Sequence, residues 1–401
     1  EAKMAELKAV LLFVFVLMAL VFADQAFVGT ASNGSLVLRP ADGQQLFIAG
    51  VDFTALLEKL ETLENQLDRH PCMTVADTTT ITGLNGDYRW IGGVLADNGK
   101  IYGIPSHSPS VLIIDPTTNT ADTTTITGFT GARKWLGGVL AGNGKIYGMP
   151  YEFKSVLVID PTTETADSTS ITDSAWVAWG WSGGVLAGNG KIYGVPFMSV
   201  SVLIIDPTTD TADTTTITGL ELAGGFKWFG GTLAGNGKIY CAPAKSPSVL
   251  IIDPATNLVD TSSITGFTIA QDDYMWSDAV LASGGKIYMI PLASESVLII
   301  DPTTNAADTT TIAGLIGSGK WSSGVLAGNG KIYGLPFGAS SSSVLIIDPA
   351  TNDTATITPG LSGDQKWWGS VLARNGRVYG IPYRSPSVLI VQQTCEIVKG
   401  L

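Results

Sequence analysis

The sequence predicts an all-β fold, a seven-bladed β-propeller of four-stranded blades, from an internal repeat and its period. Each unit holds a Trp, a small-residue segment ending in Leu-Ala, an Asn-Gly turn, Lys-Ile-Tyr-Gly-x-Pro, Ser-Val-Leu-Ile-Ile-Asp-Pro and a Thr-rich segment. A period in the forties with about four strands per unit is typical of propeller blades. By subtraction, 45 to 48 positions separate the marker tryptophans, which are Trp90, Trp135, Trp181, Trp228, Trp276, Trp321 and Trp367.

Turn chemistry assigns four strands, named a to d, to each unit. In the second unit we expect strands at residues 135–141, 145–148, 155–159 and 167–171. Asn143-Gly144 supplies the positive φ angles of a tight hairpin turn between a and b. Strand c is almost continuously apolar, which is typical of a strand buried on both faces. Strand d is rich in Thr, which suits an exposed rim.

The N-terminal end of the repeat region is expected to close the ring. A d-type strand at residues 76–82 precedes the first Trp, and the last unit ends without one. The early strand should therefore complete the last blade and leave no open edge. Aligned with the Asp-Pro-Thr-Thr turns, Cys72 and Cys395 fall in one turn, which predicts a disulfide in an oxidising compartment. Cys241 is expected to be a buried, unpaired thiol.

The first 70 residues form three further segments. Residues 1–23 are typical of a secretory signal peptide, because an apolar run ends at Ala23 and is shorter than the roughly 20 residues that span a bilayer. An uncleaved anchor is the alternative. Residues 24–50 are β-rich, with strands at 35–39 and 45–48 joined by turn residues.

Residues 51–70 are expected to form a short coiled-coil or amphipathic helix. Its apolar seam predicts self-association through residues 53–67, and packing of one helix on the propeller is the alternative. The seam residues are Phe53, Leu56, Leu60, Leu63 and Leu67.

Composition excludes some classes of function. The net charge is −12 without a basic cluster, which argues against a nucleic-acid partner. With 2 histidines and 3 cysteines, the chain offers little for a zinc site or a His-based triad. The repeated aspartates before proline are interpreted as turn caps. We therefore expect a secreted protein with no metal, no cofactor and no membrane contact after signal cleavage.

The repeats resemble the seven-bladed propeller superfamily that includes kelch and WD40 proteins. The resemblance covers about residues 74–391 and rests on period, strand count and ring closure. Gly92-Gly93 follows Trp90 within strand a, so the kelch pattern is not met, and the WD40 Gly-His and Trp-Asp pattern is absent. The superfamily contains lectins, scaffolds, lyases and glycosidases, so the resemblance implies a fold and leaves activity open.

The candidate site is the face formed by the d–a and b–c loops, which differ from blade to blade. The a–b and c–d turns are nearly uniform, and only the differing loops can build an asymmetric surface. Aromatic residues at these loops are expected to contact a ligand, although Trp176 or Trp179 could instead cap the core. The aromatic candidates are Trp176, Trp179, Tyr151, Phe153, Phe197 and Tyr383.

A second group of candidate ligand-binding residues consists of the basic residue directly before the marker Trp in five units. These basic residues are expected near the axis, where a cationic ring would attract an acidic ligand such as a uronate or sulfated glycan. The alternative is a copied residue that merely stays solvated. The group is Arg89, Lys134, Lys227, Lys320 and Lys366.

The predicted function is a secreted, non-enzymatic recognition or surface-assembly protein that binds a glycan or an extracellular protein through the variable face. Two alternatives stay open: a structural subunit of an extracellular filament or matrix, and a polysaccharide-acting hydrolase or lyase that uses acids on the same face. Sequons at Asn33 and Asn352 are expected glycosylation sites.

Overall fold

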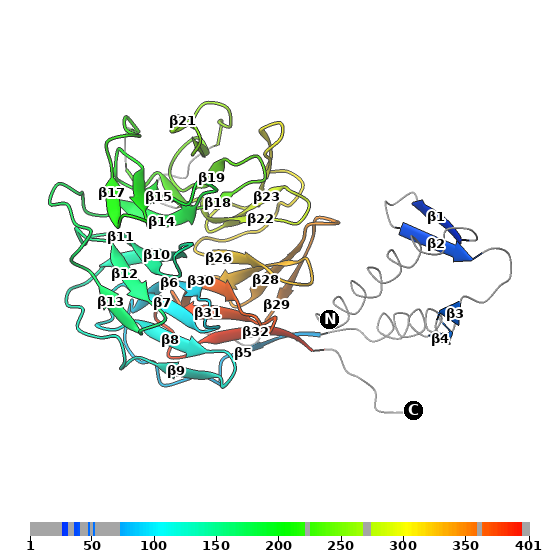
Figure 1. Cartoon of the computed structure of the whole chain (residues 1–401), viewed down its shortest axis with the longest axis horizontal. Coiled ribbons are helices and arrows are strands. Elements are labelled where there is room, and N and C mark those ends of the chain that lie inside the picture. Colours follow the sequence, from blue (N-terminus) through cyan, green and yellow to red (C-terminus); the bar gives the residue numbers. More distant parts are fainter. Residues whose placement is uncertain are drawn as a thin grey trace. The chain divides into compact units, whose positions relative to one another are not determined.

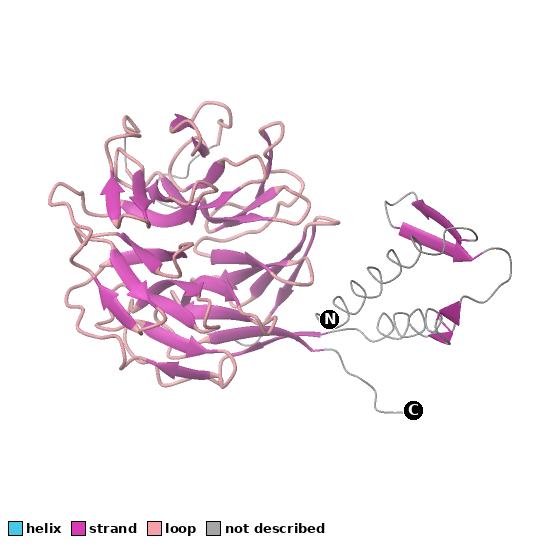
Figure 2. Cartoon of the chain, viewed as in Figure 1, coloured by secondary structure: helices cyan, strands magenta, loops and turns pink. Residues whose placement is uncertain are grey.

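The seven repeats form seven four-stranded sheets, which confirms the predicted propeller (Figure 1). The computed structural model describes residues 26–30, 36–40, 47–48, 51–52, 73–220, 225–267, 274–358 and 363–394. Thr74–Thr394 is one compact unit, and residues 1–73 with 395–401 are another. Figure 2 shows strands and loops throughout the described ranges. Within them, no helix is long and apolar enough to cross a membrane.

Blades 1 to 6 pair their strands in chain order, and neighbouring a strands contact one another around the whole ring. Blades 1 to 3 are β6 (Trp90–Leu95), β7 (Ile101–Pro105), β8 (Leu112–Asp115), β9 (Thr120–Asp122); β10 (Trp135–Leu140), β11 (Ile146–Pro150), β12 (Leu157–Asp160), β13 (Thr165–Asp167); β14 (Trp181–Leu186), β15 (Ile192–Pro196), β16 (Leu203–Asp206), β17 (Thr211–Asp213). Blades 4 to 6 are β18 (Trp228–Leu233), β19 (Ile239–Pro243), β20 (Leu250–Asp253), β21 (Leu258–Asp260); β22 (Trp276–Leu281), β23 (Ile287–Pro291), β24 (Leu298–Asp301), β25 (Ala306–Asp308); β26 (Trp321–Leu326), β27 (Ile332–Pro336), β28 (Val344–Asp348), β29 (Asp353–Ile357).

Blade 7 confirms the predicted closure of the ring. Its strand order is β30 (Trp367–Leu372), β31 (Val378–Pro382), β32 (Leu389–Thr394) and β5 (Met73–Asp77), so the N-terminal strand is the fourth. Cys72 and Cys395 lie just outside the described residues, and their disulfide stays a prediction. Cys241 is fully buried and unpaired, and burial raises the pKa of its thiol.

Strand d is placed differently from the prediction in most blades. In blade 2 it spans Thr165–Asp167 instead of residues 167–171, and β5 likewise ends at Asp77. The reason is local: the Asp167 carboxylate accepts hydrogen bonds from the backbone N–H of Thr169 at 2.7 Å and from the Ser170 hydroxyl. A capped turn replaces the ladder, and Ile171 then returns to the core.

The N-terminal unit contains two separate hairpins. β1 (Ala26–Thr30) pairs with β2 (Leu36–Pro40), and β3 (Phe47–Ile48) pairs with β4 (Val51–Asp52). The two predicted strands are therefore present, and each pairs with a different partner strand. Val51–Asp52 is a strand instead of the start of the expected helix. The signal segment 1–23, Asn33 and the seam 53–67 lie outside the described residues.

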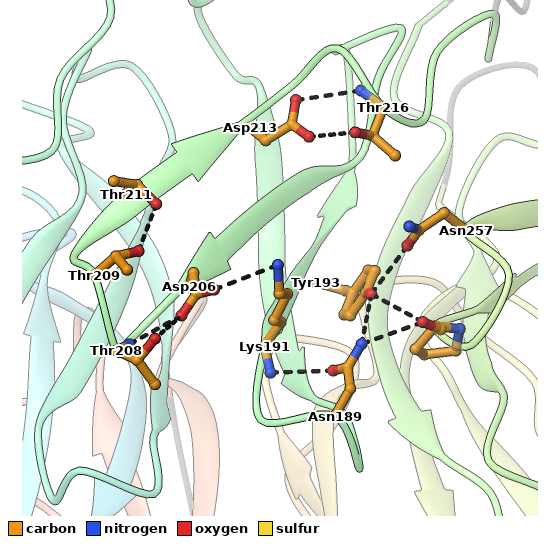
Figure 3. A network of polar contacts seen from close by, with 11 residues as sticks. Asn189, Lys191, Tyr193, Asp206, Thr208, Thr209, Thr211, Asp213, Thr216 and Asn257 are labelled. Carbon is orange, nitrogen blue, oxygen red and sulfur yellow. Dashed lines mark hydrogen bonds and ion pairs between the residues drawn. The ribbon is translucent and has the colours of Figure 1, made fainter.

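Repeated side chains tie the blades together on the uniform face, as Figure 3 shows for blades 3 and 4. The Asn189 amide donates to the Tyr193 hydroxyl at 3.0 Å and to the carbonyl oxygen of Pro254 in the next blade at 3.1 Å. The Tyr193 hydroxyl donates to Asn257 at 3.1 Å. Asp206 accepts from the backbone N–H of Thr208 at 3.0 Å, which is the predicted capping role. A cleft of about 160 Å³ lies here, but repeated residues line it, so it is a feature of the scaffold.

Candidate binding face

A belt of backbone hydrogen bonds holds the variable loops in place. In every blade, the residue before the marker Trp donates its N–H to a b–c loop carbonyl of the preceding blade; Lys134 reaches Ser106 at 3.1 Å, and Arg89 closes the ring on Tyr383 at 3.0 Å. The carbonyl oxygen of the residue before the marker Trp accepts a hydrogen bond from a backbone N–H of the b–c loop in the same blade, as Lys134 does from Tyr151 at 3.0 Å. The variable loops therefore form a rigid frame, although their side chains differ.

The residue two positions before the marker Trp has a left-handed backbone in six blades. Left-handed φ is disfavoured by roughly 1–2 kcal/mol for residues other than glycine, and strain of this kind gathers at functional sites. Five of the six residues are not glycine, and their side chains vary from blade to blade. The φ angles are 57° for Tyr88, 52° for Arg133, 59° for Trp179, 55° for Phe226, 65° for Gly319 and 51° for Gln365.

Aromatic rings from several blades meet around the axis on this face, and we call them the axial aromatic cluster. Phe229 of blade 4 and Trp368 of blade 7 meet across the axis at 5.8 Å between ring centroids. Trp179 stacks on Phe226 at 5.1 Å. Half-buried rings with both apolar area and polar edges suit ligand contact. The half-buried members are Tyr151, Trp179, Phe226, Tyr274, Trp368 and Tyr383, over the buried Phe197, Phe229, Ile91, Leu136 and Ala244.

Cations lie over the rings at the rim of the cluster. The Arg133 guanidinium is 5.7 Å from the Trp179 ring and pairs with Glu152 at 3.1 Å. The Lys245 ammonium is 5.2 Å from the Tyr274 ring. Arg384 lies 5.1 Å from the Tyr88 ring and pairs with Asp87 at 3.1 Å. These charges are half-buried or exposed, so a ligand on the cluster would meet them.

The basic residues before the marker Trp were expected either to attract an acidic ligand or to stay solvated. The structure shows neither arrangement, because their side chains are buried. Their exposed fractions are 6% or less. The Lys134 ammonium donates to the carbonyl oxygens of Ser106 at 2.8 Å and Gly131 at 2.9 Å. Lys366 and Lys320 likewise bond to carbonyls of the preceding blade. The Arg89 guanidinium donates to Ser385, also of the preceding blade. The group Arg89, Lys134, Lys320 and Lys366 thus fastens neighbouring loops, and Lys227 is buried at the same position.

Burial of these lysines predicts a measurable pH dependence of stability. Desolvation lowers the pKa of Lys134 and of Lys227 from 10.5 to about 8. Between these values the unfolded chain binds more protons, so the free energy of unfolding should rise with pH. We expect a gain of about 1–2 kcal/mol per lysine between pH 8 and pH 9.5, measured by urea unfolding. Lys134→Met should reduce this rise by the share of one lysine, and Met275 shows that a blade accommodates methionine there. An equal slope in wild type and variant would contradict this assignment.

The structure gathers some of the aromatic candidates and separates others. Trp179, Tyr151, Phe197 and Tyr383 belong to the cluster. Trp176 is 5% exposed and lies edge-on to Trp181 at 5.5 Å, so it caps the blade core. That position corrects its interpretation as a surface contact.

Phe153 also lies apart from the cluster, against Trp135 at 5.0 Å. Sequence reasoning missed Phe226, Tyr274 and Trp368. Their positions, two before and one after the marker Trp, vary among units, and that variation is the signal that marks them.

His107, in the first b–c loop, contacts the backbone. His107 Nδ1 lies 3.0 Å from the carbonyl oxygen of Tyr88, and burial lowers the pKa of His107. Within the described ranges, no three His, Cys, Asp or Glu side chains are grouped to hold a metal ion. On the opposite face, Asn352 is half-buried and accepts a hydrogen bond from the Tyr288 hydroxyl at 2.8 Å. Its glycosylation stays a prediction.

Comparison with known proteins supports the fold. No protein-family model and no curated protein matches the chain. Among solved structures, a streptogramin B lyase matches with a TM-score of 0.62 at 11% identity, covering 80% of this chain and 98% of that chain. Virginiamycin B lyase from Staphylococcus aureus matches at 0.60 and 10%, covering 81% and 100%. The extracellular domain of a hybrid two-component system from Bacteroides thetaiotaomicron matches at 0.58 and 11%, covering 82% and 44%. The protein is a seven-bladed β-propeller, and at these identities the likeness shows the fold alone.

Proposed function

We propose that the protein is a secreted, non-enzymatic recognition protein that binds a glycan or an extracellular protein through the axial aromatic cluster. One observation carries the proposal: non-glycine residues such as Trp179 and Phe226 keep a left-handed backbone at positions whose side chains vary among otherwise uniform blades. A copied scaffold has no structural need for bulky, differing side chains at a strained position. Ligand selection is a reason to keep them.

The chemistry of the cluster suits a sugar or a protein surface. Half-buried Trp and Tyr rings offer apolar area beside a polar edge, and Arg133, Lys245 and Arg384 add positive charge at the rim. Extracellular propeller domains occur among the structural neighbours, which agrees with such a role. Structural neighbours also include lyases, but on this face Glu152 and Asp87 are held in ion pairs.

A glycan array tests the proposal directly. Residues 24–401 should bind a limited set of glycans, and Trp179→Ala with Tyr383→Ala should lower binding at least tenfold by removing two half-buried rings. Phe153→Ala is the matched control, because Phe153 is an aromatic residue of a variable loop that packs on the blade core. Wild-type binding by the double variant would refute the cluster as the site.

A protein partner is the other outcome within the same proposal. If no glycan binds, a cross-linking screen of extracellular proteins should identify a partner whose binding falls in the same double variant. Self-association through residues 53–67 is part of the proposal, because linked sites gain avidity without new contacts. A mature protein that assembles into filaments without any ligand would favour the structural alternative.

A further inference from the structure

A cavity of about 170 Å³ lies on the propeller axis beneath the aromatic cluster. Strand a of all seven blades lines it, mainly through the three residues after the marker Trp. Phe229 and Trp368, which meet across the axis, are also part of the lining. Most of the other lining residues are glycine or serine, so the cavity exists because no large side chains fill the axis there. It has room for several waters or for a hydrated ion.

One carboxylate is the sole charged group among the lining residues. Asp278 stands where the neighbouring blades have Gly230 and Ser323. Its oxygens accept backbone N–H bonds from Ala279 at 2.9 Å and from Gly324 of the next blade at 3.1 Å. A carboxylate has about four acceptor sites, so acceptor capacity remains.

Two hydroxyls in the same lining lack partners in the described part of the protein. Ser323 is 5% exposed, and neither its Oγ nor that of Ser370 has a hydrogen bond. Other serines of the lining are satisfied: Ser182 and Ser322 donate to marker-Trp carbonyls of the next blade at 2.7 and 2.8 Å. Buried hydroxyls without partners are costly and call for a ligand or ordered water.

We propose that the axial cavity binds one hard cation, calcium or sodium, with Asp278 as the anionic ligand and the Ser323 hydroxyl and waters as neutral oxygen ligands. A lone carboxylate with all-oxygen surroundings suits these ions. One negative charge gives a weak site, in the millimolar range of extracellular calcium modules. The site lies beneath the axial aromatic cluster and shares Phe229 and Trp368 with it, and it goes beyond the proposed recognition function.

Thermal unfolding of the full chain tests the site. Calcium chloride or sodium chloride is compared with N-methylglucamine chloride at equal ionic strength and pH 7.5. At 10 mM calcium and a Kd near 1 mM, the Tm should rise by about 2 °C. A rise with sodium alone would identify a monovalent site.

Asp278→Asn supplies the matched control, because it keeps the size and an acceptor oxygen but removes the charge. The Tm of the cation-free variant can be higher or lower than that of the wild type. The readout is therefore the change in Tm that the cation causes, and this change should vanish in the variant. Ser323→Ala should lower calcium affinity in equilibrium dialysis. Equal cation responses in wild type and Asp278→Asn, or no response in wild type, would overturn the proposal.

Discussion

Cys72→Ser is expected to cost roughly 5 kcal/mol of unfolding free energy, because it would remove the predicted disulfide to Cys395, which would close a loop of most of the chain. Blade 7 gives the physical setting. Its fourth strand, β5, holds only Met73–Asp77, of which Met73 is 66% exposed and Val75 is 37% exposed. No side chain of this strand is fully buried, so the predicted disulfide should carry much of the closure.

The loss should appear in urea unfolding of oxidised protein, and Cys395→Ser and the double variant should lose the same amount. Reductant should reduce wild-type stability to the level of the variants. Cys241→Ala is the control, because that buried thiol lies far along the chain in blade 4 and forms no disulfide. Non-reducing peptide mapping that finds both thiols free would remove the basis of this expectation.

The fold was predictable because the residues that define a blade act locally. An Asn-Gly pair sets a turn wherever it occurs, although only its glycine has the predicted positive φ, as Gly144 does at 79°. The marker Trp occupies the same core position each time and donates to a serine carbonyl, as Trp135 does to Ser155 at 2.7 Å. Strand d was misplaced for an equally local reason. Thr propensity suggested a strand after Asp167, but the aspartate carboxylate competes with the ladder for the same N–H groups.

The site was predictable only in part, because its contacts join residues from different blades. Nothing near Lys134 in the sequence reveals that its ammonium is buried against Ser106, 28 positions earlier and in another blade. Trp176 and Trp179 are three residues apart in one loop, yet one enters the blade core and the other joins the axial cluster. The left-handed backbone of Trp179 distinguishes the two residues, and the type of side chain does not predict that backbone conformation.

Gly369→Ala is expected to destabilise the propeller by about 3–5 kcal/mol, because it combines two costs. The φ of Gly369 is +107°, and an added Cβ would lie 2.6 Å from the Cα and 2.9 Å from the backbone nitrogen of Gly92 in the neighbouring blade. Backbone cannot rotate away as a side chain can. Since the ring is closed, moving blade 7 outward would disturb every other interface.

A graded series separates the two costs. Gly376 also has a positive φ, +78°, but an added Cβ would have no atom within 4 Å. Gly376→Ala should therefore lower the free energy of unfolding by the backbone strain alone, about 1–2 kcal/mol. Gly137→Ala, whose Cβ would lie 3.3 Å from the Cα of Gly183, should fall between the two. Urea unfolding ranks the three variants, and the intermediate one remains measurable even if Gly369→Ala does not fold. Equal losses across the series would mean that the blades can move apart at the axis, and that backbone contact there does not set the size of the ring.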